Sequence, residues 1–283
     1  MGTNTNNLCQ IEAKVSYRLP LVGGFSDFPE FYRYREGETI SCTIDKFVSI
    51  CISENEFDGL DIKSKADLPW GIGLGSSGVY YSALVSALSR YKGRSLTNKN
   101  IAKLAYNLEI GIDESATGRQ DSMACLYRGL IRINYLPDDT LIVRTISIPD
   151  EWRHLLNRRL LLFDTGSRRS ARESIKDILT RADMPLVSEI AKLPRKLVHA
   201  WNKGDLDFLG SALNLQEEFR SQLSPSCNSA KTNRILKLAR ECGAGARLTG
   251  AGIGCLLCYC REEHQKALRD RLGLREFKFS IEW

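Results

Sequence analysis

The sequence of 283 residues has no apolar run near the length of about 18 residues that a membrane helix needs. Its first ten residues are polar and rich in asparagine, without the basic and then apolar pattern of a secretion signal. We therefore expect a cytoplasmic protein with no membrane partner. Histidine is scarce as well, with three in the chain and none in a Ser/His/Asp setting, so we do not expect histidine-based catalysis.

The nine cysteines are odd in number and are scattered through apolar stretches. A secreted chain would pair them, whereas a reducing compartment leaves them as thiols, which is what we expect here. Cys255, Cys258 and Cys260 form the densest group, but His264 stands alone as a possible fourth zinc ligand. We interpret the group as small hydrophobic residues of the core.

The formal net charge of +6 is compatible with nucleic acid or with anionic small molecules as ligands. Basic residues are not interleaved with aromatic ones, and no nucleic-acid-binding motif is present. We therefore expect phosphorylated ligands and no nucleic-acid partner. The oligomeric state cannot be deduced from the sequence.

Hydrophobic periodicity predicts an α+β protein. Strands are expected within residues 11–52 and at 131–135, 141–146, 160–163, 246–249, 255–260 and 277–283. Helices are expected from Val79 and from Thr97 or Asn98, and around 170–180, 186–202, 205–222, 231–242 and 262–272. The second half has a split β-α-β layout with inserted helices. A boundary near residue 155 divides the chain into domains at 1–155 and 156–283.

The segment from Pro69 to Gly78 is rich in glycine and serine and leads directly into a predicted helix. Glycines let the backbone approach phosphates closely, and the N–H groups at the start of a helix favour an anion. The segment is not a Walker A loop, because no Gly-Lys-Ser/Thr follows. We expect a nucleotide phosphate site, with a purely structural loop as the alternative. Its residues are Gly71, Gly73, Leu74, Gly75, Ser76, Ser77 and Gly78.

Three further segments carry residue types suited to catalysis. In the predicted loop 118–122, Asp121 lies twelve residues after Glu109, and two such carboxylates suit a catalytic base and a metal ligand. Taken alone, an exposed aspartate and a surface glutamate would be the commoner explanation. Residues 250–254 are glycine-rich and include Gly250 and Gly252, which a simple hairpin would also explain. Arg18 precedes a turn with Gly23, Gly24 and Asp27, where Asp27 could accept hydroxyl groups or simply cap the turn.

Together and in this order, the four segments resemble the GHMP kinases, a superfamily that includes galactokinase, homoserine kinase and mevalonate kinase. Residues 69–78 resemble its central P-x-G-x-G-L-G-S-S signature, and 249–254 resemble its C-terminal glycine motif. The heptose 7-phosphate kinases are the branch with the greatest similarity. Their G-K-Q-D-Q-Y-A is matched at 118–124, and their T-G-x-x-R-S-A is matched at 165–171, where Arg169 falls on the arginine.

The resemblance implies a two-domain fold, with an N-terminal domain like the second domain of ribosomal protein S5 and a ferredoxin-like C-terminal domain. It also implies an ATP- and Mg²⁺-dependent kinase that acts on a small sugar or sugar phosphate. Asp121 would be the catalytic aspartate and Arg18 the arginine near the transferred phosphoryl group. Ser77 and Glu109 would hold magnesium. The implied substrate-binding residues are Gly23, Gly24, Asp27, Arg169, Gly250 and Gly252.

The sequence departs from the family pattern at Gly78, Ser122 and Ile253, and at Phe25, which replaces a glycine near the sugar. Because the nucleotide loop is intact, we expect an active kinase, with the anomeric hydroxyl of a heptose 7-phosphate as the acceptor. The alternatives are a fucose-, galactose- or octose-type kinase and a catalytically silent sugar and nucleotide sensor. The sensor is disfavoured because Asp121, Arg18 and Glu109 are retained.

Overall fold

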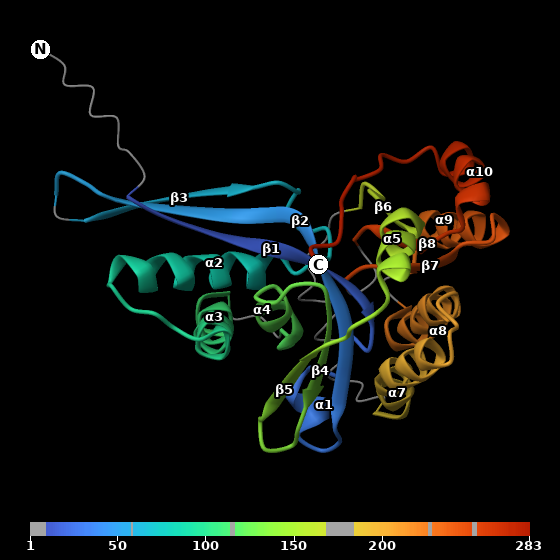
Figure 1. Cartoon of the computed structure of the whole chain (residues 1–283), viewed down its shortest axis with the longest axis horizontal. Helices are drawn as coiled ribbons and strands as arrows, with labels where there is room; N and C mark the ends of the chain where they lie inside the picture. The colour runs from blue at the N-terminus through green and yellow to red at the C-terminus, as the bar shows by residue number, and fades with distance from the viewer. Residues whose placement is uncertain (1–9, 58, 114–116, 168–183, 226–227, 251–253) are drawn as a thin grey trace, which may run out of the picture.

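Figure 1 shows the computed structural model, in which a large sheet with its helices lies beside a smaller helix-rich half. The structure describes residues 10–57, 59–113, 117–167, 184–225, 228–250 and 254–283. Among these residues, no helix is long and apolar enough to cross a membrane.

The larger sheet has five antiparallel strands, β1 to β5. Its centre is the long strand β2, which pairs with β1 along one edge and with β3 and β4 along the other. The register of β1 shifts between Ser16 and Arg18 and again between Pro20 and Val22. Such irregularities re-aim side chains, and here they flank Arg18. The strands are β1 (Ile11–Val22), β2 (Gly37–Glu54), β3 (Leu60–Ala66), β4 (Leu130–Tyr135) and β5 (Leu141–Thr145).

Helices cover one face of this sheet. The helix α2 packs against β1 and β2, and α3 and α4 pack against α2 (Figure 1). At the start of α3, the Asn100 backbone N–H donates to Thr97 Oγ1 at 3.3 Å, so Thr97 acts as the predicted cap. The helices of this half are α1 (Pro29–Tyr32), α2 (Ser76–Tyr91), α3 (Asn98–Asp113) and α4 (Gln120–Ala124).

The second half is built on a three-stranded antiparallel sheet in the order β6-β8-β7. The helix α8 packs on β7 and β8 and also reaches β1, while α7 packs on α8 and on β1 and β2. The elements are α5 (Asp150–Arg159), β6 (Leu160–Phe163), α7 (Met184–Asn202), α8 (Phe208–Leu223), α9 (Ala230–Glu241), β7 (Gly245–Leu248), β8 (Leu256–Tyr259) and α10 (Glu262–Leu272).

Most predicted elements are confirmed, but the final strand is wrong. Its alternation is real, because Phe277 and Ile281 are buried while Lys278 is exposed. This part of the chain nevertheless forms only isolated bridges, from Glu276, just before the predicted strand, to Phe163 of β6 and from Ile281 to Ile44 of β2. Alternation shows which side chains face inward, but it does not show whether one partner strand runs alongside.

Four elements were not predicted: β3, the short helices α1 and α4, and α5, which spans the proposed boundary near residue 155. One continuous hydrophobic cluster also joins the two halves, since it includes Leu19 and Ile50 together with Leu162 and Leu257. The division at residues 1–155 and 156–283 therefore stays a prediction. The helix expected around 170–180 lies outside the described residues.

The cysteines differ from expectation at one position. Six of the seven described cysteines are buried thiols without a disulfide bond, as expected: Cys42, Cys125, Cys242, Cys255, Cys258 and Cys260. Cys51 is disulfide-bonded, so the expectation of a thiol there is wrong. Among those residues, no cluster of histidine, cysteine or acidic side chains is arranged to hold a metal ion.

Candidate active site

The glycine-rich loop enters α2 through a series of left-handed turns. Gly71, Gly73 and Gly75 have φ of 74°, 74° and 71°, a region that side chains rarely adopt. Gly75 is the last residue before α2, which begins at Ser76. The helix thus starts three residues earlier than predicted, and its first-turn N–H groups, together with Ser76 and Ser77, lie at the end of the loop. This is an arrangement suited to phosphate.

The C-terminal glycine motif supports this loop directly. Thr249 Oγ1 donates a 2.7 Å hydrogen bond to the carbonyl of Ile72, and the Cys255 backbone N–H donates to the same carbonyl at 3.1 Å. A Cβ on Gly73 would lie 2.6 Å from the backbone nitrogen of Gly250, so the two backbones touch. The structure therefore brings Gly250 to the predicted phosphate loop, whereas Gly252 and Ile253 lie outside the described residues.

Asp121 lies between this loop and Arg18. It occupies the first turn of α4, a helix that begins at Gln120 within a segment predicted as a loop. Arg18 donates to Asp121 Oδ1 through Nε at 2.9 Å and also through Nη2. A Cβ on Gly75 would lie 2.7 Å from Asp121 Cγ, and one on Gly78 would lie 2.8 Å from Asp121 Cβ. The structure thus places the predicted base against the predicted phosphate loop.

Asp27 connects two of the predicted segments. Its Oδ1 accepts the Phe25 backbone N–H at 3.0 Å, and its Oδ2 accepts the Gln120 N–H at 3.1 Å. A Cβ on Gly118 would lie 1.8 Å from Oδ2, so a glycine is required there. Burial raises the pKa of Asp27 to about 6, and the negative charge of Asp121 adds to this. Asp27 therefore fixes the turn against α4, and its role as a sugar ligand stays a proposal.

Phe25 adopts φ of 77°, a strained value for a bulky residue. Its ring is buried and stacks on Phe28 with centroids 6.5 Å apart. This explains how a phenylalanine can stand where the related sequences have glycine, because core packing offsets the backbone strain.

The region of Gly23 and Gly24 contains residues that the sequence analysis missed. The Gly23 N–H donates to Gln216 Oε1 at 2.8 Å, so α8 contacts this turn. Glu217 and Arg220 follow on α8, and all three side chains are at most 2% exposed. The available signal was a set of polar residues at core-facing positions of an otherwise amphipathic helix.

Glu109 is buried on α3, and Ser77 lies in the first turn of α2. A hydroxyl and a carboxylate are hard oxygen ligands, and nucleotide-bound magnesium usually takes only one or two carboxylates besides phosphate oxygens. The donor set therefore fits magnesium. Arg169, the predicted phosphate ligand, lies outside the described residues.

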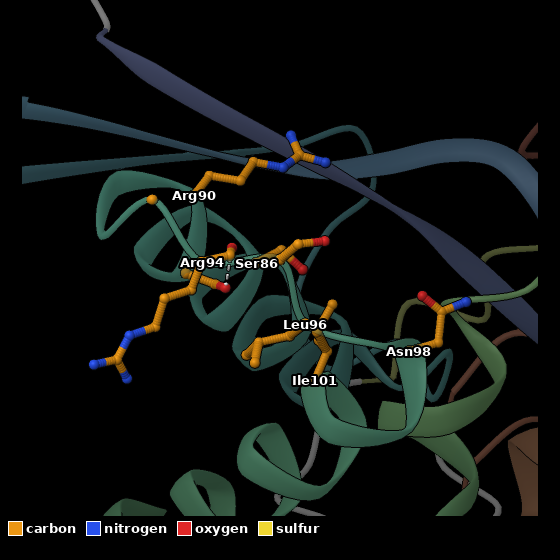
Figure 2. Close-up of a pocket in the computed structure, with 9 residues that line it drawn as sticks. Ser86, Arg90, Arg94, Leu96, Asn98 and Ile101 are labelled. Atoms are coloured by element: carbon orange, nitrogen blue, oxygen red, sulfur yellow. Dashed lines mark hydrogen bonds between the residues drawn. The ribbon is translucent and has the colours of Figure 1, made fainter.

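A separate cavity of about 450 Å³ opens at the far end of α2 (Figure 2). Arg90 reaches toward β1 and donates to the Glu12 carbonyl at 2.8 Å, whereas Arg94 points away from it. None of the predicted site residues lines this cavity. Its lining is formed by Ser86, Ser89, Arg90, Gly93, Arg94, Ser95, Leu96, Asn98 and Ile101.

Comparison with known families identifies the larger part of this site. Residues 39–129 match the model described as the GHMP kinases N terminal domain, and this range contains the loop, Glu109 and Asp121. These residues form a GHMP kinase N-terminal domain. Members of the GHMP family are ATP-dependent kinases, so the family assignment supports phosphoryl transfer as the class of reaction.

Similar proteins include several kinds of GHMP kinase. A bifunctional fucokinase/GDP-fucose pyrophosphorylase from Arabidopsis thaliana is 28% identical over 233 residues, 78% of this chain but only 22% of that protein. A mevalonate kinase from Thermococcus sibiricus is 23% identical over 279 residues, 93% of this chain and 79% of that protein. A D-glycero-alpha-D-manno-heptose 7-phosphate kinase from Campylobacter jejuni is 26% identical over 231 residues, 77% of this chain and 67% of that protein.

The fold is shared with a solved D-glycero-D-manno-heptose 1-phosphate kinase from Bacteriodes thetaiotaomicron. The two superpose with a TM-score of 0.78 over 96% of both chains, at 18% sequence identity. The chain therefore has the α+β GHMP kinase fold that the resemblance implied.

Proposed function

We propose that this GHMP kinase transfers the γ-phosphoryl group of ATP to a hydroxyl of a sugar or sugar phosphate, with the anomeric hydroxyl of a heptose 7-phosphate as the first candidate. The observation that carries the proposal is the position of Asp121, which is paired with Arg18 and lies against Gly75 and Gly78 of the loop. A carboxylate beside a phosphate-binding loop is positioned to receive a hydroxyl proton during phosphoryl transfer.

The roles of the other residues follow from their chemistry. The loop and the N–H groups at the start of α2 would hold the phosphates. Asp121 would orient the acceptor hydroxyl and take its proton as the hydroxyl oxygen bonds to phosphorus and the bond to ADP breaks. Arg18 would hold Asp121 in position and stabilise charge on the transferred group. Ser77 and Glu109 would hold Mg²⁺, which supplies charge neutralisation on the phosphates.

The acceptor class is supported by relatives with two kinds of substrate. The Campylobacter relative is named as a heptose 7-phosphate kinase, which favours a phosphorylated sugar. The Arabidopsis relative includes a fucokinase and has a higher identity over a similar length, which favours an unphosphorylated sugar as the second candidate. Arg169 remains our proposed ligand for a substrate phosphate.

A screen of ATP consumption tests the proposal. The acceptors are a free heptose, its 7-phosphate, L-fucose and mevalonate, each with ATP and magnesium. We expect turnover with the heptose 7-phosphate and little with the free heptose. Preference for fucose would establish the second candidate. Absence of ATP consumption with every acceptor would contradict the proposed activity.

A further inference from the structure

The helix α8 presents polar side chains to the core. Gln216, Glu217 and Arg220 are 0%, 2% and 1% exposed, although the buried face of such a helix is normally apolar. Buried polar groups persist when they are paired or when they have a function, so each of their atoms deserves an account.

Several of these atoms are used to fasten α8 to its neighbours. Gln216 Oε1 accepts the Gly23 N–H at 2.8 Å, and Glu217 Oε2 accepts the Leu248 N–H at 2.9 Å. Arg220 donates through Nε to Glu217 Oε1 at 3.1 Å, and through Nη2 to Asn228 Oδ1 at 2.7 Å. These bonds hold α8 against both the Gly23 turn and β7.

Two N–H donors on the same helix are unpaired within the described part of the chain. Gln216 Nε2 and Arg220 Nη1 are buried and have no hydrogen-bond partner among the residues that the structure describes. Because the two residues are four apart, they lie on one face of α8. Arg18 Nη1 is a third such donor within the described chain. An unpaired buried N–H is unfavourable, so three of them in the region of the candidate site point to a missing acceptor.

Two observations place these donors close to the proposed acceptor site. A Cβ added to Gly24 would meet no atom within 4 Å, so there is open space next to the turn that Gln216 contacts. The charges of Arg18 and Arg220 both act on the buried Arg247, whose pKa is lowered to about 10, chiefly by its own burial. Arg247 also donates through Nη1 to the Pro20 and Leu21 carbonyls at 3.2 and 3.0 Å, on the strand that carries Arg18. Arg18, Arg220 and Arg247 therefore belong to one buried polar layer, and Arg18 connects this layer to the partly exposed Asp121.

We propose that Gln216 and Arg220 are acceptor-binding residues whose leftover N–H donors bind an anionic oxygen group of the substrate, either a phosphate or a carboxylate. Guanidinium and amide N–H groups are well suited to such an oxygen group, and a site built around them rejects substrates that lack it. This inference rests on the proposed kinase function and specifies the acceptor of the same site.

The decisive variant is Gln216→Glu. It keeps a side-chain oxygen that accepts the Gly23 N–H, but it replaces the Nε2 donor by a second oxygen of a negatively charged carboxylate, which repels an anion. Gln222→Glu is the matched control, because Gln222 is exposed on the same helix and the charge change is identical. Calorimetry measures binding of heptose 7-phosphate, mevalonate (a carboxylate) and L-fucose (uncharged), and steady-state assays measure the KM for each acceptor and for ATP.

We expect Gln216→Glu to weaken binding of whichever anionic acceptor the parent prefers by roughly 10- to 100-fold, the size of a charge-assisted hydrogen bond. The KM for ATP should stay unchanged, and Gln222→Glu should behave as the parent. The preferred acceptor distinguishes a phosphate group from a carboxylate. Should Gln216→Glu fail to fold, Arg220→Lys replaces it, since lysine keeps a cation beside Glu217 but loses the N–H fork.

The inference is overturned if the folded variant binds the anionic acceptors as tightly as the parent does, or if the parent prefers fucose to both anions. In the latter case ATP-dependent turnover of fucose would still show a kinase, so the function would stand without the inference. Conversely, anion binding that depends on Gln216 in a protein without turnover would uphold the binding site and overturn the activity.

Discussion

At the scale of single residues, the environment of Asp121 determines its chemistry. Its partner Arg18 is 5% exposed, and the contact between them includes a 2.9 Å bond from Nε. The guanidinium and the carboxylate form a charge-assisted hydrogen bond, which fixes the carboxylate in place. The same contact orients Asp121 toward the loop, so Arg18 acts on Asp121 by positioning it.

Asp121→Asn should therefore retain ATP binding but lower kcat by roughly 10²-fold or more, the typical contribution of a general base. Steady-state kinetics at saturating substrates and calorimetry with ATP measure the two effects. Asp270→Asn is the control, since this exposed carboxylate lies on α10, away from the site. A kcat within a few-fold of the parent would show that Asp121 is not catalytic.

Asp27 should make stability depend on pH. Its pKa is raised from 3.8 to about 6 in the folded chain, first by burial and then by the charge of Asp121. Between about pH 4 and 6 the folded state binds more protons than the unfolded chain. The contribution of Asp27 to the free energy of unfolding therefore falls as pH rises through this window, and it no longer changes above it. This change amounts to at most about 3 kcal/mol.

Asp27→Asn removes this titration. The difference in unfolding free energy between parent and variant should shrink by roughly 2–3 kcal/mol between pH 4 and 6.5. Urea unfolding across this range measures it, and Asp270→Asn should follow the pH profile of the parent. A difference that is constant with pH would contradict the raised pKa.

At the scale of elements, the turn before α2 depends on glycine for two separate reasons. Gly75 has φ of 71°, and its missing Cβ leaves room for Asp121, whose Cγ would be 2.7 Å away. Gly93, after the same helix, has φ of 65° and would meet no atom within 4 Å. Comparing substitutions at Gly75 and Gly93 therefore separates the effect of backbone strain from the effect of contact with the site.

Gly75→Ala and Gly93→Ala should each destabilise the fold by about 1 kcal/mol through backbone strain. Only Gly75→Ala should also displace Asp121 and lower kcat, by roughly 10-fold or more. Gly75→Asp should go further and abolish ATP binding, because it adds a carboxylate to the phosphate site. Equal kcat values for the two alanine variants would contradict the assignment of this loop.

At the scale of the whole molecule, the C-terminal segment joins the two sheets. The Phe277 N–H donates to the Leu162 carbonyl at 2.8 Å, and the Glu282 N–H donates to the Thr43 carbonyl at 3.0 Å. Phe277 and Ile281 are buried in the cluster that both halves share. We therefore expect the two proposed domains to unfold together.

Ile281→Ala should lower the free energy of unfolding by roughly 2–5 kcal/mol, the usual cost of this truncation in a core. Unfolding should remain a single transition by both circular dichroism and tryptophan fluorescence. Ile62→Ala is the control, because Ile62 is 45% exposed and should change stability little. Separate transitions by the two probes would show that the halves unfold independently.

The sequence by itself predicted most of the helices and strands and identified the glycine-rich loop as a candidate phosphate site. Periodicity and glycine patterns are local, so they can be read without knowing the fold. The same patterns placed Asp121 and Gly250 among the candidates, and the structure brings both against the loop. The terminal strand was predicted wrongly because pairing depends on a partner distant in sequence.

Only the tertiary structure decided which residues meet. The contact of Gln216 with Gly23 joins positions 193 residues apart, and nothing local in the sequence pairs them. The raised pKa of Asp27 likewise depends on burial and on the nearby charge of Asp121. Burial and long-range contact are properties of the packed chain, so the polar layer formed by α8 and Arg18 appears only once the two halves are packed together.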